Sequence, residues 1–286
     1  MAEILTTPQE LKDALAAGAY PDGGPVRILD VRWRLDKPDG RDDYRAGHIP
    51  GAVYVDLDHE LASHGAPQEG RHPLPAREEF EASARRWGIR RGDTVVVYDN
   101  LKNLSSARAW WLLRFFGVAD VRLLDGSLRA WTSAGYGLAT GDEAPSEGGD
   151  VVLTEGTLPT LDLDTVADFA STRLLLDARA SERYRGDVEP IDPRAGHIPG
   201  AVNAPTTDNV DGDGRFLPEG ALRARFTALG GAVGTPVGVY CGSGVTAAHE
   251  AVALSLAGFE PVLYPGSWSQ WSNHPERAVA TGAEPG

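Results

Sequence analysis

The chain contains a single cysteine, Cys241, and its sequence context favours a reactive thiol. Cys241 follows the apolar run Pro236–Tyr240, which predicts a buried strand, and precedes a short loop and a helical stretch. A thiolate at that point would face unpaired backbone N–H groups and the positive end of a helix dipole, both of which stabilise its charge. The pattern therefore predicts a nucleophilic cysteine at the carboxyl end of a strand, where open α/β sheets bind ligands.

The residues after the cysteine, 242–246 (GSGVT), are suited to cradle an anion. Gly242 and Gly244 allow the loop to curl so that its N–H groups converge. Ser243 and Thr246 add hydroxyl donors, and we expect Val245 to contribute through the same loop. A lone cysteine is otherwise often a small buried apolar residue, but its position between strand and helix favours the reactive interpretation.

The elements that position this loop occur twice. Residues 45–53 (RAGHIPGAV) recur at 194–202, each after an apolar run that ends in Asp-x-Arg, at 28–32 and 175–179. Each half closes with Gly-Ser-x-x-x-Trp, at 126–131 and 266–271. The histidines of the two GHIPG motifs are expected to be satisfied locally in a turn that leads into a strand. The chain is therefore an internal tandem repeat.

Short apolar strands alternate with helical stretches in both halves, which predicts an α/β fold with parallel βαβ units. We expect two tandem domains, each with a central, mostly parallel sheet and helices on both faces. The N-terminal domain is assigned to residues 1–140 and the C-terminal domain to residues 156–286. Residues 141–155, rich in Gly, Pro, Ser and acids, are expected to link them.

The two halves differ at the position of the cysteine, where the first half has Asp99. The following loop, residues 100–104 (NLKNL), contains no glycine. We therefore expect that its N–H groups do not converge on an anion.

Composition limits the partners. Lys and Arg number 27 and Asp and Glu number 41, giving a net charge of −14 that disfavours nucleic acid and anionic membranes. No apolar run approaches the length of a membrane span, and no basic segment at the start suggests a secretory signal. One thiol cannot form an internal disulfide, and it stays reduced in the cytoplasm, which is the expected location.

Taken together, the two GHIPG motifs, residues 177–179 (DAR), the CGSGVT loop and the closing Gly-Ser-x-x-x-Trp resemble the tandem-domain rhodaneses, which are sulfurtransferases. The resemblance implies that the first domain is inactive and that Cys241 carries a persulfide. The loop is most similar to that of 3-mercaptopyruvate sulfurtransferases, because thiosulfate sulfurtransferases usually have Arg and Lys there and this loop has no basic residue.

The resemblance also implies roles for individual residues. Cys241 corresponds to the nucleophile and Ser243 to the serine that assists it. Asp58 corresponds to a catalytic acid from the N-terminal half, and His72 to a histidine of the substrate site. Arg183 corresponds to an arginine that holds the substrate carboxylate.

A second carboxylate-binding arginine usually follows a short way downstream. Here residues 187–193 read DVEPIDP, and Arg194 is the next arginine and hence the candidate.

The function that follows is transfer of a sulfane sulfur from 3-mercaptopyruvate, or thiosulfate, to cyanide or a thiol, or to a thioredoxin-like protein. No metal or organic cofactor is implied. The alternatives are a thiosulfate sulfurtransferase and a non-catalytic persulfide carrier. A cysteine phosphatase needs an arginine six residues after the cysteine, where this chain has Ala247. Residues 242–247 also fit a dinucleotide-binding G-x-G-x-x-A, but no acid ends the next strand.

Overall fold

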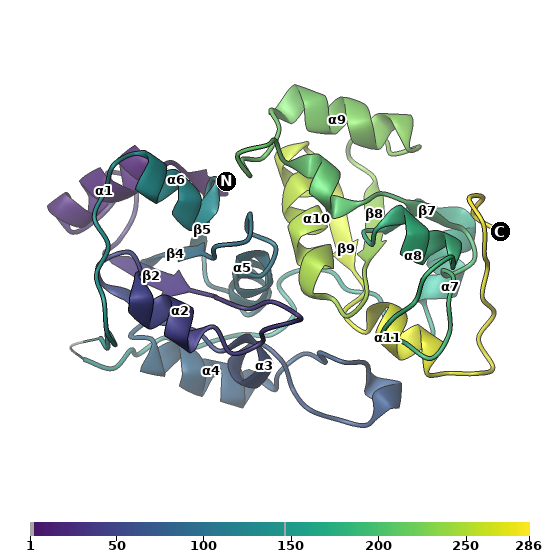
Figure 1. Ribbon diagram of the computed structural model, residues 1–286, viewed down its shortest axis with the longest axis horizontal. Coiled ribbons are helices and arrows are strands. Elements are labelled where there is room, and N and C mark those ends of the chain that lie inside the picture. Colours follow the sequence, from purple (N-terminus) through teal and green to yellow (C-terminus); the bar gives the residue numbers. More distant parts are fainter. Residues whose placement is uncertain (1–2, 146) are drawn as a thin grey trace. The chain divides into compact units, whose positions relative to one another are not determined.

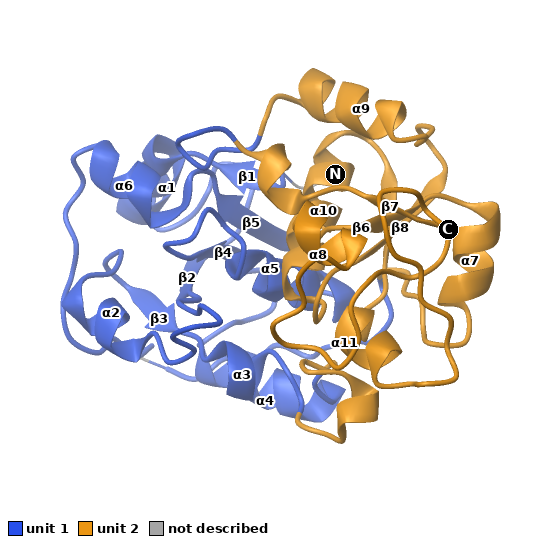
Figure 2. Ribbon diagram, turned by 45° about the vertical axis from the view of Figure 1, so that its right-hand side comes forward, with its two compact units in different colours: residues 1–63, 75–157, 211–216 blue, residues 64–74, 158–210, 217–286 orange. Residues whose placement is uncertain are grey.

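The computed structural model describes residues 3–145 and 147–286 and divides into two compact units (Figure 2). Unit 1 takes in the chain up to residue 63, residues 75–157 and residues 211–216. Unit 2 takes in residues 64–74, 158–210 and 217–286. Each half of the chain therefore lends a short segment to the unit built mainly by the other half.

Unit 1 is built on a five-stranded parallel sheet in the order β1-β5-β4-β2-β3 (Figure 2). Its strands are β1 (Leu5–Thr6), β2 (Val26–Asp30), β3 (Ala52–Tyr54), β4 (Thr94–Tyr98) and β5 (Asp120–Leu124). Its helices are α1 (Pro8–Ala17), α2 (Arg41–Ala46), α3 (Leu57–Glu60), α4 (Arg77–Arg86), α5 (Ser106–Phe115) and α6 (Ser127–Ser133).

Unit 2 is built on a four-stranded parallel sheet in the order β7-β6-β8-β9. Its strands are β6 (Leu175–Asp177), β7 (Ala201–Asn203), β8 (Pro236–Tyr240) and β9 (Glu260–Leu263). Its α-helices are α7 (Val166–Thr172), α8 (Ser181–Arg185), α9 (Glu219–Ala228), α10 (Val245–Leu256) and α11 (Ser267–Ser272). Two 3-10 turns, η1 (Pro67–Glu69) and η2 (Thr206–Asn209), complete it.

The predicted α/β fold with two parallel sheets is thus confirmed. The central strands form because β-branched residues suit a strand that is covered on both faces, and β4 (TVVVY) is buried along its whole length. In unit 2, α7 and α11 share one core cluster through Val166, Trp268 and Trp271. Helix α10 packs against β8, β9 and α9 on the other side of the sheet (Figure 1).

Both GHIPG histidines are structural. His48 and His197 are fully buried, stack on Tyr44 and Tyr184, and pair through Nδ1 with the carbonyl of the same tyrosine, at 2.9 and 2.8 Å. The histidine thus fixes the turn that starts the next strand, as the sequence pattern predicts.

The Asp-x-Arg motif of unit 2 ties the end of β6 to the loops around it. Arg179 binds both carboxylate oxygens of Asp177 and the carbonyl of Gly196, and its guanidinium stacks on Trp268. Burial opposes the charge of Arg179, but the ion pair and hydrogen bonds with Asp177, together with Tyr240 and Glu189, raise the pKa of the guanidinium. No helix in the described residues is long and apolar enough to cross a membrane.

Candidate active site

Cys241 is the first residue after β8, and its side chain is only 2% exposed. Its Sγ accepts a hydrogen bond from the Gly244 N–H at 3.1 Å. Its own N–H donates to Ser267 Oγ at 3.2 Å, and its carbonyl accepts from the N–H of Trp268 at 3.0 Å. The start of α11 therefore holds the cysteine in place, while the loop after it donates to the sulfur.

The loop geometry is that of an anion cradle. Gly244 has a left-handed backbone (φ 80°) and is the N-cap residue of α10, so the helix begins directly behind the sulfur. A hydrogen bond to sulfur and a helix N-terminus both stabilise a thiolate more than a thiol. Val245 and Thr246 open the helix, the first buried and the second half-buried.

Ser243 and His72 form a direct pair beside the cysteine. The Ser243 hydroxyl and His72 Nδ1 lie 2.8 Å apart, and both side chains are buried. His72 reaches unit 2 because the segment 64–74 belongs to that unit. The Arg71 N–H donates to Ser269 Oγ at 3.0 Å, which fixes this segment to α11.

Arg183, on α8, extends over the loop. Its Nη2 lies 2.7 Å from Glu189 Oε1 and 3.2 Å from Asp192 Oδ2. Its Nη1 lies 3.3 Å from the point that a Cβ on Gly242 would occupy. The structure thus brings Cys241, Ser243, His72 and Arg183 together within unit 2.

A second guanidinium, that of Arg71, lies over the same glycine. Its Nη2 is 3.5 Å from the point that a Cβ on Gly242 would occupy, so two cations border a loop that has no basic residue of its own. The absence of basic residues within the loop therefore does not leave the thiol without nearby cations. Both cations come from other segments, which the loop residues by themselves do not indicate.

Arg194 has a different environment from the one expected. Its guanidinium donates to four main-chain carbonyls at 2.8–3.0 Å, those of Trp271, Ser272, His274 and Arg277. These bonds use most of its donors and tie the turn after α11 to the rest of unit 2. None of these contacts is with the loop that follows Cys241.

Asp58 lies in unit 1, on the short helix α3, and is half-buried. Its Oδ1 accepts a hydrogen bond from Trp33 Nε1 at 2.8 Å. The role given to Asp58 by the family resemblance stays a prediction.

The loop of unit 1 corrects another expectation. The N–H groups of Leu101, Asn103, Ser105 and Ser106 all donate to the Asp99 carboxylate, at 2.7–3.0 Å. They converge without a glycine because Lys102 and Asn103 themselves adopt left-handed backbone (φ 58° and 65°). The first half thus retains an anion cradle, and its own Asp99 fills it.

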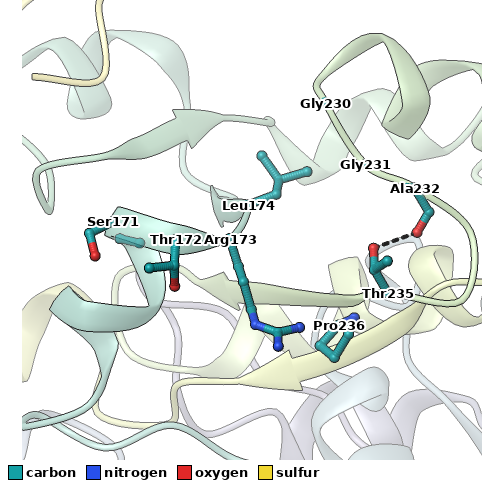
Figure 3. A pocket seen from close by; sticks show the side chains of 10 residues that line it. Ser171, Thr172, Arg173, Leu174, Gly230, Gly231, Ala232, Thr235 and Pro236 are labelled. Atoms are coloured by element: carbon teal, nitrogen blue, oxygen red, sulfur yellow. Dashed lines mark hydrogen bonds between the residues drawn. The ribbon is translucent and has the colours of Figure 1, made fainter.

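One large hollow in unit 2 is remote from the cysteine. It measures about 660 Å³ and lies where β6 and β8 begin, bordered by Arg173, Gly231 and Thr235 (Figure 3). Cys241 follows the other end of β8, so the hollow and the thiol lie at opposite ends of the sheet. In the described part of the chain, no group of three or more His, Cys, Asp or Glu side chains could hold a metal ion.

Sequence reasoning missed four residues around the loop: Arg71, Glu189, Asp192 and Ser267. Arg71 could have been found from the sequence, because it directly precedes His72, which was already a candidate for the substrate site. Glu189 and Asp192 lie in the stretch where an arginine was sought, and both are acids. Ser267 belongs to the closing Gly-Ser-x-x-x-Trp motif, whose recurrence in both halves indicated a structural role that its bond to the Cys241 N–H explains.

Two regions of the chain, residues 7–134 and 163–274, match the model of the rhodanese-like domain. A Mycobacterium tuberculosis protein, provisionally named thiosulfate sulfurtransferase SseB, is 49% identical over 282 residues, 98% of each chain. A Pseudomonas aeruginosa protein, provisionally named 3-mercaptopyruvate sulfurtransferase, is 47% identical over 293 residues, covering 98% of this chain and 99% of its own.

Among solved structures, SseA from Escherichia coli, described for the fold and mechanism of 3-mercaptopyruvate sulfotransferases, matches with a TM-score of 0.80 at 31% identity. The match covers 92% of this chain and 98% of SseA. On these grounds the chain belongs to the rhodanese family, and it is a sulfurtransferase with two rhodanese-like domains.

Proposed function

We propose that the enzyme takes its sulfur from 3-mercaptopyruvate and carries it as a persulfide on Cys241. The observation that supports this most is the loop itself. A thiol accepts the Gly244 N–H at 3.1 Å at the start of α10, beneath the guanidinium of Arg183. The loop stabilises an anionic sulfur, and the arginine suits a carboxylate.

In the first half-reaction the Cys241 thiolate attacks the donor sulfur. A sulfur–sulfur bond forms, the carbon–sulfur bond of the donor breaks, and its electron pair leaves as the enolate of pyruvate. The enolate needs a proton, and the Ser243–His72 pair, 2.8 Å apart beside the cysteine, is positioned to relay one. The loop N–H groups stabilise the persulfide anion that remains.

In the second half-reaction an acceptor removes the outer sulfur and regenerates the thiolate. Cyanide and small thiols are suitable because they are thiophilic nucleophiles. A thioredoxin-like protein is proposed as a further acceptor. The cytoplasm is the proposed location, because its reducing conditions keep a lone catalytic thiol active.

The experiment that tests the donor is a comparison of kcat/KM for 3-mercaptopyruvate and thiosulfate with cyanide as the common acceptor. We expect 3-mercaptopyruvate to be preferred about tenfold, the low end of the cost of an uncompensated charge. Glu189 and Asp192 offset the charges of Arg183 and Arg71, so a monoanion is balanced better than a dianion. A preference for thiosulfate would contradict the assignment.

Thiosulfate is the second candidate because two guanidinium groups border the loop and because the M. tuberculosis relative carries that name. A non-catalytic carrier is the third. Steady turnover with either donor would exclude it, whereas a single round of sulfur loading without turnover would support it.

The Ser243–His72 pair leads to a separate prediction. Ser243→Ala and His72→Asn should each lower kcat with 3-mercaptopyruvate about tenfold or more, because proton transfer to the enolate loses its relay. The double variant should be little worse than either single variant, since the two groups act through one hydrogen bond. Losses that multiply fully would contradict a shared relay.

A further inference from the structure

The segment 64–74 brings a second arginine to the cysteine loop, and its surroundings point to a ligand. Its main chain docks on unit 2 through the bond from the Arg71 N–H to Ser269 Oγ. The Ser269 N–H in turn donates to the carbonyl of Gly242, at 2.8 Å. One serine therefore fixes both Arg71 and the loop of Cys241, so the two are held in register.

The acid Asp192 holds both guanidinium groups. Its Oδ1 lies 2.9 Å from Arg71 Nη1 and its Oδ2 lies 3.2 Å from Arg183 Nη2. The Asp192 side chain is 3% exposed, so the carboxylate is committed to these two partners. A buried acid shared between two arginines fixes the distance between them and their orientation.

The two arginines differ in which donors remain for a ligand. Arg183 directs Nε and Nη2 to Glu189, so its bidentate edge is already occupied, and Nη1 is the nitrogen nearest Gly242. Arg71 uses Nη1 for Asp192 and places Nη2 over Gly242. The buried Nε of Arg71 has no hydrogen-bond partner among the described residues.

Nε and Nη2 form the edge of a guanidinium that binds both oxygens of a carboxylate. A hollow of about 390 Å³ in unit 2 is bordered by Arg71, Asp192 and Asn273, so there is space for a small anion beside this residue.

We infer that Arg71 is a donor-binding residue, which takes the donor carboxylate on its Nε–Nη2 edge while Arg183 Nη1 supplies a third hydrogen bond. Asp192 is the positioning residue for both. This inference rests on the proposed function, since it assumes that the donor reacts at Cys241. The second contact to the donor carboxylate is thus assigned to Arg71, which is distant in sequence from Arg194, the candidate that the sequence suggests.

The test compares two donors that differ only in the carboxylate. One is 3-mercaptopyruvate, and the other is 1-mercaptopropan-2-one, in which a methyl group replaces the carboxylate. Arg71→Met should lower kcat/KM for 3-mercaptopyruvate about 10- to 100-fold, mainly through KM, and for the neutral ketone less than about threefold. Arg71→Lys should recover part of the loss, because it restores the charge without the bidentate edge.

Arg173→Met is the matched control, because Arg173 lies in unit 2 at the opposite end of the sheet (Figure 3). Arg173→Met should leave kcat/KM unchanged for both donors. Equal losses for both donors in Arg71→Met would indicate a purely structural role and overturn the inference, as would no loss at all. If the wild-type enzyme gains no sulfur on Cys241, the proposed function fails instead, and intact-mass measurement distinguishes that outcome.

Discussion

Replacement of Cys241 by serine should abolish sulfur transfer, lowering kcat by at least about 1,000-fold, because an oxygen cannot carry the transferred sulfur. Treated with donor and no acceptor, the wild-type protein should gain about 32 Da, the mass of one sulfur, and the serine variant should gain nothing. Since Cys241 is the only cysteine, any persulfide in the wild type must reside there.

The serine variant should also keep its fold, so that the loss can be assigned to chemistry. The Gly244 N–H that now donates to Sγ can donate to the smaller hydroxyl oxygen, and the bond from the Cys241 N–H to Ser267 is unchanged. A thermal transition within a few degrees of the wild type checks this. Turnover that survives in the serine variant would refute a Cys241 persulfide as the intermediate.

The position of this cysteine was predictable because local sequence determines it. A β-branched strand, a glycine-containing loop and an apolar helix follow one another at 236–256, and parallel sheets expose such loops at the carboxyl ends of their strands. The same order of strand, loop and helix occurs in both halves, which strengthened the prediction. The local role of the two GHIPG histidines was predictable for the same reason. Contacts within a short stretch of chain are those that sequence periodicity encodes.

The cations at the loop were less predictable, because they depend on contacts between distant segments. Arg71 reaches Asp192 across 121 positions, and nothing in the spacing of either residue indicates the pair. Residues 187–193 contain no arginine, yet Asp192 in that stretch binds Arg71 from a distant segment. Pattern-based reasoning identifies which residue types are present but not which remote partner satisfies a buried charge.

The prediction for the loop after β4 in unit 1 was wrong for a different reason. Glycine was taken as a requirement for converging N–H groups, yet Lys102 and Asn103 adopt the left-handed conformation there. Six hydrogen bonds to the Asp99 carboxylate, four from main-chain N–H groups and two from the hydroxyls of Ser106 and Ser127, offset that strain. Tertiary contacts thus overrode a local preference that is weak for asparagine and stronger for lysine.

Arg183→Met should lower kcat/KM for 3-mercaptopyruvate about 100- to 1,000-fold, more than the loss of one charge-assisted hydrogen bond alone. Arg183 does two things at once. Its Nη1 faces the loop, and its Nη2 neutralises Glu189 and Asp192, whose side chains are 4% and 3% exposed. Without the arginine, Glu189 and Asp192 would each lose an ion-pair partner while keeping Arg179 and Arg71, and the added negative charge would repel the carboxylate of the incoming donor.

The matched control for this prediction is Arg185→Met, on the same helix α8, because Arg185 pairs with Asp187 at 2.7 Å and its side chain is 39% exposed. That variant should stay within about twofold of the wild type, since exposed ion pairs contribute little. A double variant tests the charge balance further: Glu189→Gln added to Arg183→Met should recover part of the lost kcat/KM, because it removes a buried negative charge that Arg183 neutralises. If Arg183→Met and Arg185→Met lose equal activity, or if Glu189→Gln deepens the loss, then Arg183 neither binds the donor nor balances the acids beneath it, and helix α8 matters only for the fold.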